Sequence, residues 1–196
     1  SRGRRGRERG CGGGGGEGGR GRGGGGGAGE CGQGVPLAGG LVLDRGGRSG
    51  VRAIGPGTVT TGPGAILVDI DRATKAAGGQ ELRMHPSTHR TASIGGFVAG
   101  GSGGIGSVRW GGLRDLGNIV RLAVMTMEAE PRKLSLTGED LHKVSHAYGT
   151  NGVITELALP LTAACEWVGL LVGFAALTPA ASFAYPAPRH AGLPTL

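Results

Sequence analysis

Aromatic residues are scarce in this chain, and its apolar runs are short. Phe, Trp and Tyr together make up 4% of the 196 residues, which is too little for the base-stacking surface of an RNA-recognition domain. The longest apolar run, Trp167–Leu177, falls well short of the ~20 residues that a membrane-spanning helix needs. We therefore expect neither that kind of RNA-binding surface nor a membrane span.

Cysteine is also rare. The three cysteines, Cys11, Cys31 and Cys165, are far apart and odd in number, and they form neither a C-x-x-C pair nor a zinc-ligand pattern. Such cysteines fit a reducing compartment better than an oxidising one. The first residues contain no apolar segment like that of a secretory signal peptide. The sequence therefore predicts a cytoplasmic protein.

Glycine, by contrast, is abundant, with 46 residues. It does not recur at every third position, which excludes a collagen helix. The net charge is +7, but much of the basic excess lies in residues 1–28, a Gly/Arg-rich stretch without apolar periodicity. We expect this stretch to be disordered. A second interpretation is an RGG-type RNA-binding tail, although no Phe or Tyr stands between its Arg-Gly steps.

Residues 29–168 alternate between strand and helix patterns, which predicts an α+β domain. The predicted strands cover 41–44, 51–61 (two strands about a turn at 55–57), 119–127, 133–136 and 153–161, and the predicted helices cover 65–77, 94–100 and 140–147. The first helix is expected to pack through Ile66, Ile70, Ala73 and Ala77. The residues predicted for the core are Ile66, Ile70, Ile94, Val98, Val124, Ile154 and Leu157.

Residues 169–196 are rich in Ala and Pro. Four prolines, Pro179, Pro186, Pro188 and Pro194, are expected to break any helix there, so we expect an irregular tail. Both flanks of the domain have the composition that a shifted reading frame yields from GC-rich DNA. Our hypothesis is that the domain is truncated or frameshifted at both ends.

The segment from Met84 to Asp115 is unusual for its paired glycines, with short hydroxyl residues between them. Glycine lets a backbone N–H approach a ligand closely, and hydroxyls add the donors that a pyrophosphate or a polar heterocycle needs. A flexible Gly-rich loop is the alternative. Linkers, however, usually lack the apolar residues, the Trp and the Arg-Asp pair that this segment contains.

Four motifs in this segment carry a resemblance to known proteins: Pro86-Ser87-Thr88, Thr91-Ala92-Ser93-Ile94-Gly95-Gly96, Ala99-Gly100-Gly101 and Trp110-Gly111-Gly112-Leu113-Arg114-Asp115. They resemble the flavin-binding core of FAD-linked oxidoreductases of the vanillyl-alcohol oxidase / p-cresol methylhydroxylase (PCMH) type, especially the glycolate-oxidase-subunit and D-lactate-dehydrogenase-like branch. A later block, Tyr148–Glu156, is similar to that family's G-T-x-G-I-I-T-E segment. Residues 29–40 look like the end of its first pyrophosphate loop, without the usual Thr and Asn.

The resemblance implies the second lobe of a PCMH-type FAD-binding domain, in which an antiparallel or mixed sheet carries short helices behind a disordered Gly/Arg-rich N-terminus. It implies FAD as the cofactor, and a turn from Thr91 to Gly96 that lays backbone amides against the flavin pyrophosphate and ring edge. The residues implied to bind FAD are Pro86, Ser87, Thr88, Thr91, Ser93, Ile94, Gly95, Gly96, Gly100, Gly101, Gly149, Thr150, Gly152, Val153 and Ile154.

The resemblance also implies a function. Members of the family pass a hydride from a 2-hydroxy acid or an alcohol to flavin, so we expect a small hydroxy-acid or alcohol substrate. No catalytic residue can be assigned, and no covalent flavin link is assigned to a histidine. His142 and His146 have a zinc-compatible spacing, but no third ligand accompanies them, and we expect no metal. The alternative is a non-enzymatic Gly/Arg-rich RNA-binding protein, although nucleic acid is not the partner we expect.

Overall fold

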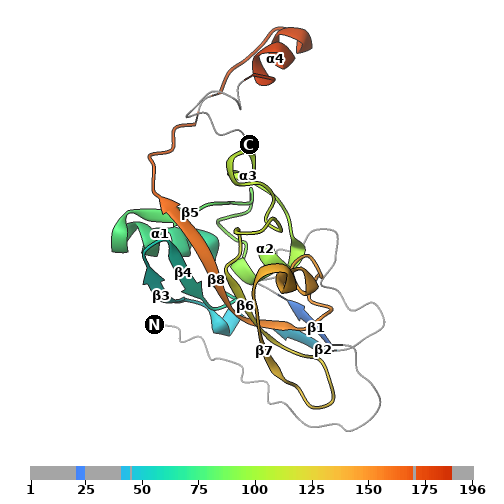
Figure 1. The fold of residues 1–196 in the computed structure, drawn as a ribbon. Helices are drawn as coiled ribbons and strands as arrows, with labels where there is room; N and C mark the ends of the chain where they lie inside the picture. The colour runs from blue at the N-terminus through green and yellow to red at the C-terminus, as the bar shows by residue number, and fades with distance from the viewer. Residues whose placement is uncertain (1–20, 25–40, 45, 170, 187–196) are drawn as a thin grey trace, which may run out of the picture.

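The long strand β8 (Val153–Ala163) organises the domain, as Figure 1 shows. The computed structural model describes residues 21–24, 41–44, 46–169 and 171–186. In this part of the chain, β8 pairs antiparallel with β4 (Thr58–Thr61), β6 (Arg121–Met125) and β5 (Gln80–Leu82). The outer strands are β3 (Val51–Gly55) beside β4 and β7 (Lys133–Leu136) beside β6. The result is a six-stranded antiparallel sheet carrying short helices, which confirms the predicted fold class.

The centre of β8 is a continuous apolar run. Every residue from Leu157 to Leu161 is buried, which is the pattern of a strand covered on both faces rather than on one. In β6, Leu122, Ala123 and Val124 are buried in the same way. Six of the seven predicted core residues are buried, and only Ile66 is partly exposed. The helix and strand periodicities therefore identified six of these seven core residues correctly.

The helix α1 (Leu67–Gly78) lies where the sequence predicts it and ends at Gly79, whose φ of 61° closes the helix in the left-handed conformation. Its buried face differs from the prediction. Leu67, Ile70, Asp71 and Thr74 are buried, whereas Ala77 is exposed. The predicted face was therefore right at Ile70 and wrong at Ala77. Apolar spacing also does not find Asp71, a buried carboxylate that has partners across the domain.

The predicted helix at 140–147 was also wrong. The structure has a short 3-10 helix, η3 (Gly138–Lys143), followed by turns. His146 and Tyr148 both have positive φ, at 62° and 53°, which a right-handed helix does not allow. His142 and His146 consequently do not share a helix face, and no group of three His, Cys, Asp or Glu residues that could hold a metal occurs in the described chain.

Two further segments differ from expectation. Strand β1 (Gly21–Gly24), inside the stretch predicted to be disordered, pairs in parallel with β2 (Leu41–Asp44). The other residues of that stretch, and the loop at 29–40, lie outside the described residues. In the tail predicted to be irregular, α4 (Leu177–Ala184) forms a helix with Pro179 in its first turn, where proline is tolerated.

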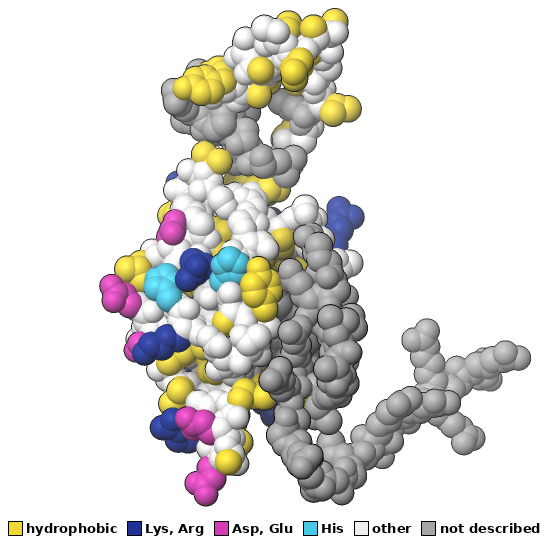
Figure 2. Space-filling model, turned by 90° about the vertical axis from the view of Figure 1, so that its right-hand side faces the viewer, with side chains coloured by type: hydrophobic (Ala, Val, Ile, Leu, Met, Phe, Trp, Pro, Cys, Tyr) yellow, Lys and Arg dark blue, Asp and Glu magenta, His cyan; other side chains and the backbone are white. Residues whose placement is uncertain are grey.

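Helix α4 projects away from the sheet (Figure 1), and hydrophobic side chains gather on this projecting end (Figure 2). Leu177, Phe183 and Tyr185 are all exposed, and no residue of α4 is buried. Among the described residues, no helix has both the length and the apolar character that crossing a membrane requires.

Candidate functional site

The short helix α2 (Ile94–Gly100) lies at the centre of the predicted site, with the bounds that the sequence predicts. Ser93 caps its first turn, because the Ser93 hydroxyl accepts a hydrogen bond from the Gly96 amide at 3.3 Å. Gly101 closes the other end with a φ of 65°. The predicted FAD-binding residues lie on segments that meet the two ends of this helix.

The turn 86–91 leads into the N-terminal end of α2. It is closed by hydrogen bonds from the His89 amide to the Pro86 carbonyl (3.0 Å) and from the Thr91 amide to the Thr88 carbonyl (2.9 Å). Ser87, Thr88 and Thr91 are exposed, whereas Pro86 is buried. Three predicted hydroxyls are therefore accessible to a ligand, and the proline anchors the turn.

The amides at the start of α2 have partners within the domain. The Ile94 amide donates to the Ala65 carbonyl at 2.8 Å, and the Gly95 amide donates to the Pro63 carbonyl at 2.9 Å. A Cβ on Gly95 would lie 2.7 Å from that carbonyl oxygen, while a Cβ on Gly96 would meet only the Ser93 hydroxyl, at 3.0 Å. Packing alone thus requires Gly95, and the requirement at Gly96 is much weaker.

The second predicted block meets the C-terminal end of α2. The His146 amide donates to the Val98 carbonyl (3.1 Å) and the Tyr148 amide donates to the Ala99 carbonyl (2.9 Å). A Cβ on Gly101 would lie 2.4 Å from the His146 Cβ, so the two backbones are in close contact. The fold therefore brings Gly100 and Gly101 next to the loop that begins at Gly149, although these segments are far apart in the chain.

Residues 152–154 form the start of the central strand. Val153 pairs with Met125 and Ile154 with Val124. Gly152 is buried with a φ of 147°, and a Cβ there would lie 2.7 Å from the Val124 side chain. Gly152 and Ile154 are therefore required by the sheet, whereas the neighbouring Thr150 is exposed.

Residues 20–135 match the protein family described as "FAD binding domain". The chain belongs to this FAD-binding family. FAD is therefore its cofactor. The matched region begins before residue 29, the domain boundary that the sequence predicts, and it includes β1.

Solved structures support the fold of this FAD-binding domain. Two structures of alkyldihydroxyacetonephosphate synthase, in P212121 and in P1, superpose on it with TM-scores of 0.62 and 0.61 at 21% sequence identity. Each alignment covers 73% of this chain and 27% of the synthase, so the chain spans about a quarter of that enzyme's length. No curated protein sequence matches the chain.

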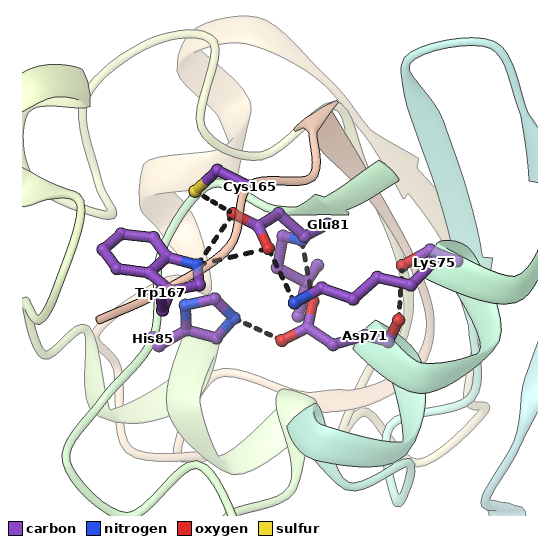
Figure 3. A network of polar contacts seen from close by, with 8 residues as sticks. Asp71, Lys75, Glu81, His85, Cys165 and Trp167 are labelled. Carbon is purple, nitrogen blue, oxygen red and sulfur yellow. Dashed lines mark hydrogen bonds and ion pairs between the residues drawn. The ribbon is translucent and has the colours of Figure 1, made fainter. Parts of the chain in front are cut away.

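Sequence reasoning missed one polar cluster of the FAD-binding domain, shown in Figure 3. Glu81 of β5 is only 2% exposed, and its carboxylate meets the Lys75 ammonium at 2.9 Å and accepts from the Trp167 indole at 3.1 and 3.3 Å. The Cys165 thiol donates to the same carboxylate at 3.4 Å. The hydrogen bond to Glu81 raises the pKa of Lys75. We refer to Lys75, Glu81, Cys165 and Trp167 as the Glu81 cluster.

A second buried carboxylate lies beside the Glu81 cluster. Asp71 of α1 is hydrogen-bonded through one carboxylate oxygen to the His85 imidazole, and its other oxygen accepts from the Leu82 amide at 2.8 Å. His85 directly precedes the turn 86–91, so this pair fastens the start of that turn to α1 (Figure 3). Local spacing gave no signal for the contact between Asp71 and His85, because the two residues lie 14 positions apart.

Two hollows lie in the described part of the domain, and one of them is beside α2. A cavity of about 20 Å³ is lined by Ile94, Phe97, Arg83 and Asn118, among others, and a wide depression of about 470 Å³ lies at the β3–β4 turn beside Gln80. Neither is lined by the exposed hydroxyls of Ser87, Thr88 and Thr91. Of the predicted FAD-binding residues, Ile94 alone lines one of the two.

Proposed function

We propose that this chain is the cofactor-binding part of an oxidoreductase that passes a hydride from a 2-hydroxy acid or an alcohol to FAD. The observation that carries the proposal is the family match over residues 20–135. FAD, when bound, supplies the hydride acceptor, and the protein contributes binding, orientation and electrostatics. The synthase that shares the fold is named for another reaction, so the fold by itself does not choose the substrate.

The residues around α2 suit a polar, extended ligand. The exposed hydroxyls of Ser87, Thr88 and Thr91 offer both donors and acceptors to it. Gly96 and Gly100 are partly exposed, and without a Cβ they allow a ligand to approach the backbone. We propose that these five residues contact FAD at the N-terminal end and along the open side of α2.

The other implied residues divide into two groups. Thr150 is exposed, while Gly101 and Val153 are partly exposed, and we propose that these three contact FAD beyond the C-terminal end of α2. The remaining residues are buried, so we propose that they shape the site through the backbone. These shaping residues are Pro86, Ser93, Ile94, Gly95, Gly149, Gly152 and Ile154.

The amides of Ile94 and Gly95 donate within the domain. We therefore propose that the exposed hydroxyl groups, rather than these amides, make the polar contacts with FAD. This differs from the amide-lined turn that the family resemblance implies. It predicts that Thr88→Val weakens FAD binding without changing the helix.

A Gly96→Val variant tests the site. The side chain would crowd the open side of α2, so we expect FAD affinity to fall at least about tenfold, corresponding to ~1.4 kcal/mol of binding free energy. Titration with FAD, followed by flavin fluorescence, measures the affinity, and thermal unfolding checks that the domain stays folded. Gly47→Val is the matched control, because a Cβ at Gly47 has open space around it. Equal FAD affinity in wild type and Gly96→Val would refute the site.

A further inference from the structure

Two arginines share one indole ring on the loop side of the domain. The guanidinium carbon of Arg83 lies 4.3 Å from the centroid of the Trp110 ring, and that of Arg109 lies 5.0 Å from it. Both contacts are within the range of cation–π attraction. We refer to Arg83, Arg109 and Trp110 as the Arg–Trp–Arg cluster.

Close backbone packing assembles this cluster. His85 and Ile105 form an isolated bridge with reciprocal hydrogen bonds of 3.0 and 2.8 Å, which sets residue 83 beside the segment that leads into α3 (Ser107–Trp110). A Cβ on Gly106 would lie 2.0 Å from the Arg83 carbonyl oxygen, and Gly106 has a φ of 99°. Only glycine permits this approach, so the fold places Arg83 against the α3 indole specifically.

The loop after α3 is also fixed in place. The Asn118 side chain donates to the carbonyls of Trp110 (2.7 Å) and Gly112 (2.8 Å), and Arg83 Nη1 donates to the Gly117 carbonyl at 3.4 Å. Hydrogen bonds within the domain therefore preorganise the Arg83 side chain and the loop that follows Trp110. Preorganisation reduces the entropy that a ligand would otherwise lose on binding.

The charge of the cluster is not balanced. Four arginines in the described chain, Arg52, Arg72, Arg121 and Arg132, each meet a carboxylate. Neither Arg83 nor Arg109 does so within the described residues, and the buried Nε of Arg83 has no hydrogen-bond partner. Two like charges held at one ring repel each other, and an anion between or beside them would relieve that repulsion.

We propose that the Arg–Trp–Arg cluster binds the anionic group of a small-molecule ligand, either a carboxylate or a phosphate. Arg109 is exposed, and Arg83 and Trp110 are half-buried, so solvent reaches the guanidinium groups while the ring shields one side. Guanidinium forks suit both anions, because each presents two oxygens to parallel N–H groups. The site does not depend on flavin binding.

Tryptophan fluorescence tests the proposal in the full chain without FAD. Trp110 and Trp167 are the two tryptophans, so a Trp167→Phe background makes the emission report on Trp110. Inorganic phosphate and glycolate are titrated separately, each against sodium chloride of equal ionic strength, and the wild-type chain is titrated in parallel. We expect a saturable change with at least one of the two anions and none with chloride.

Variants locate the binding. Arg109→Gln removes an exposed side chain without an ion pair in the described chain. We expect at least about tenfold weaker anion binding, because a charge-assisted hydrogen bond to the anion is lost. Arg83→Gln should weaken it similarly, with thermal unfolding measured alongside since Arg83 also holds Gly117. Arg132→Gln, an exposed arginine paired with Glu128, is the matched control. The Gly/Arg-rich N-terminal stretch is the same in every variant.

The response to the three salts distinguishes the possible ligands. Saturation by phosphate alone supports a phosphate-bearing ligand, saturation by glycolate alone supports a carboxylate, and saturation by both supports a general anion site. A response that chloride reproduces would overturn the proposal, as would equal affinity of Arg109→Gln and Arg132→Gln. Because no FAD is present, failure here leaves the Gly96→Val result unaffected, and the two proposals can be judged separately.

Discussion

The Glu81 cluster and the Arg–Trp–Arg cluster differ in whether their charged groups are paired with groups of opposite charge. Glu81 is buried, and its carboxylate meets an ammonium, an indole N–H and a thiol. Arg83 and Arg109 lie nearer the surface and meet an aromatic ring but no carboxylate in the described chain. A buried charge must be paired because its desolvation is costly. An accessible charge is hydrated and can therefore stay unpaired until a ligand binds. The difference indicates a structural role for the first cluster and a binding role for the second.

The largest effect should come from removing the centre of the Glu81 cluster. Glu81→Ala leaves the Lys75 ammonium and the Trp167 indole without their acceptor, so we expect the free energy of unfolding to fall by about 2–3 kcal/mol. Urea denaturation measures it. Glu130→Ala, an exposed carboxylate without an ion pair in the described chain, is the control. A loss below ~1 kcal/mol would show that the cluster is not structural.

An intermediate effect is expected at Glu156, a carboxylate that is 24% exposed and paired with both Arg121 and Arg52. The hydrogen bond from Arg121 is the main cause that lowers the pKa of Glu156 in the folded chain, and Arg52 adds to it. A lowered carboxylate pKa stabilises the fold above the unfolded-state pKa, and that stability is lost as the pH falls through the folded-state pKa.

The Glu156→Gln variant checks this sign. We expect it to be less stable than wild type at pH 7 by at most about 1 kcal/mol, the upper range for such surface pairs. The gap between the two proteins should narrow as the pH falls below 4.5, the ordinary carboxyl value. Thermal unfolding at pH 7 and at lower pH measures it. A gap that widens in acid would contradict the assignment.

The smallest effect should come from the Arg–Trp–Arg cluster. Arg109→Gln removes an exposed, unpaired charge next to another, so we expect the free energy of unfolding to change by less than about 0.5 kcal/mol. A binding site without a structural role predicts this result together with the loss of anion binding. A destabilisation comparable to that of Glu81→Ala would instead assign the cluster to the fold and remove the contrast between the two regions.

Local sequence patterns predicted much of the fold. Contiguous apolar residues marked β6 and β8, the Gly-Pro-Gly turn joined β3 to β4, and paired glycines closed α1 and α2. These features depend on residues close together in the sequence, so their spacing is enough to predict them. The same reasoning failed at 140–147, where His146 has a positive φ and its amide donates to the carbonyl of Val98, a residue distant in sequence.

The candidate site was only partly predictable for the same reason. The motifs around α2 identified a flavin protein, and the family match confirms FAD as the cofactor. The sequence could not show that Pro63 leaves no room for a side chain at residue 95. Nor could it show that the Ile94 amide already donates to the Ala65 carbonyl. Whether a backbone group is free to bind a ligand depends on contacts between distant segments. Those contacts cannot be predicted from local sequence patterns.

By itself, then, the sequence determined most of the strands, the position of α1, the bounds of α2 and the class of cofactor that the chain binds. It did not predict the strands β1 and β5. The tertiary structure alone decided which charges are paired. Asp71 and Glu81 are buried with partners, while Arg83 and Arg109 meet at Trp110 through a glycine that lets two backbones touch. The physical reason is that propensity and periodicity act over a few residues, whereas burial and pairing depend on which distant segments the folded sheet brings together.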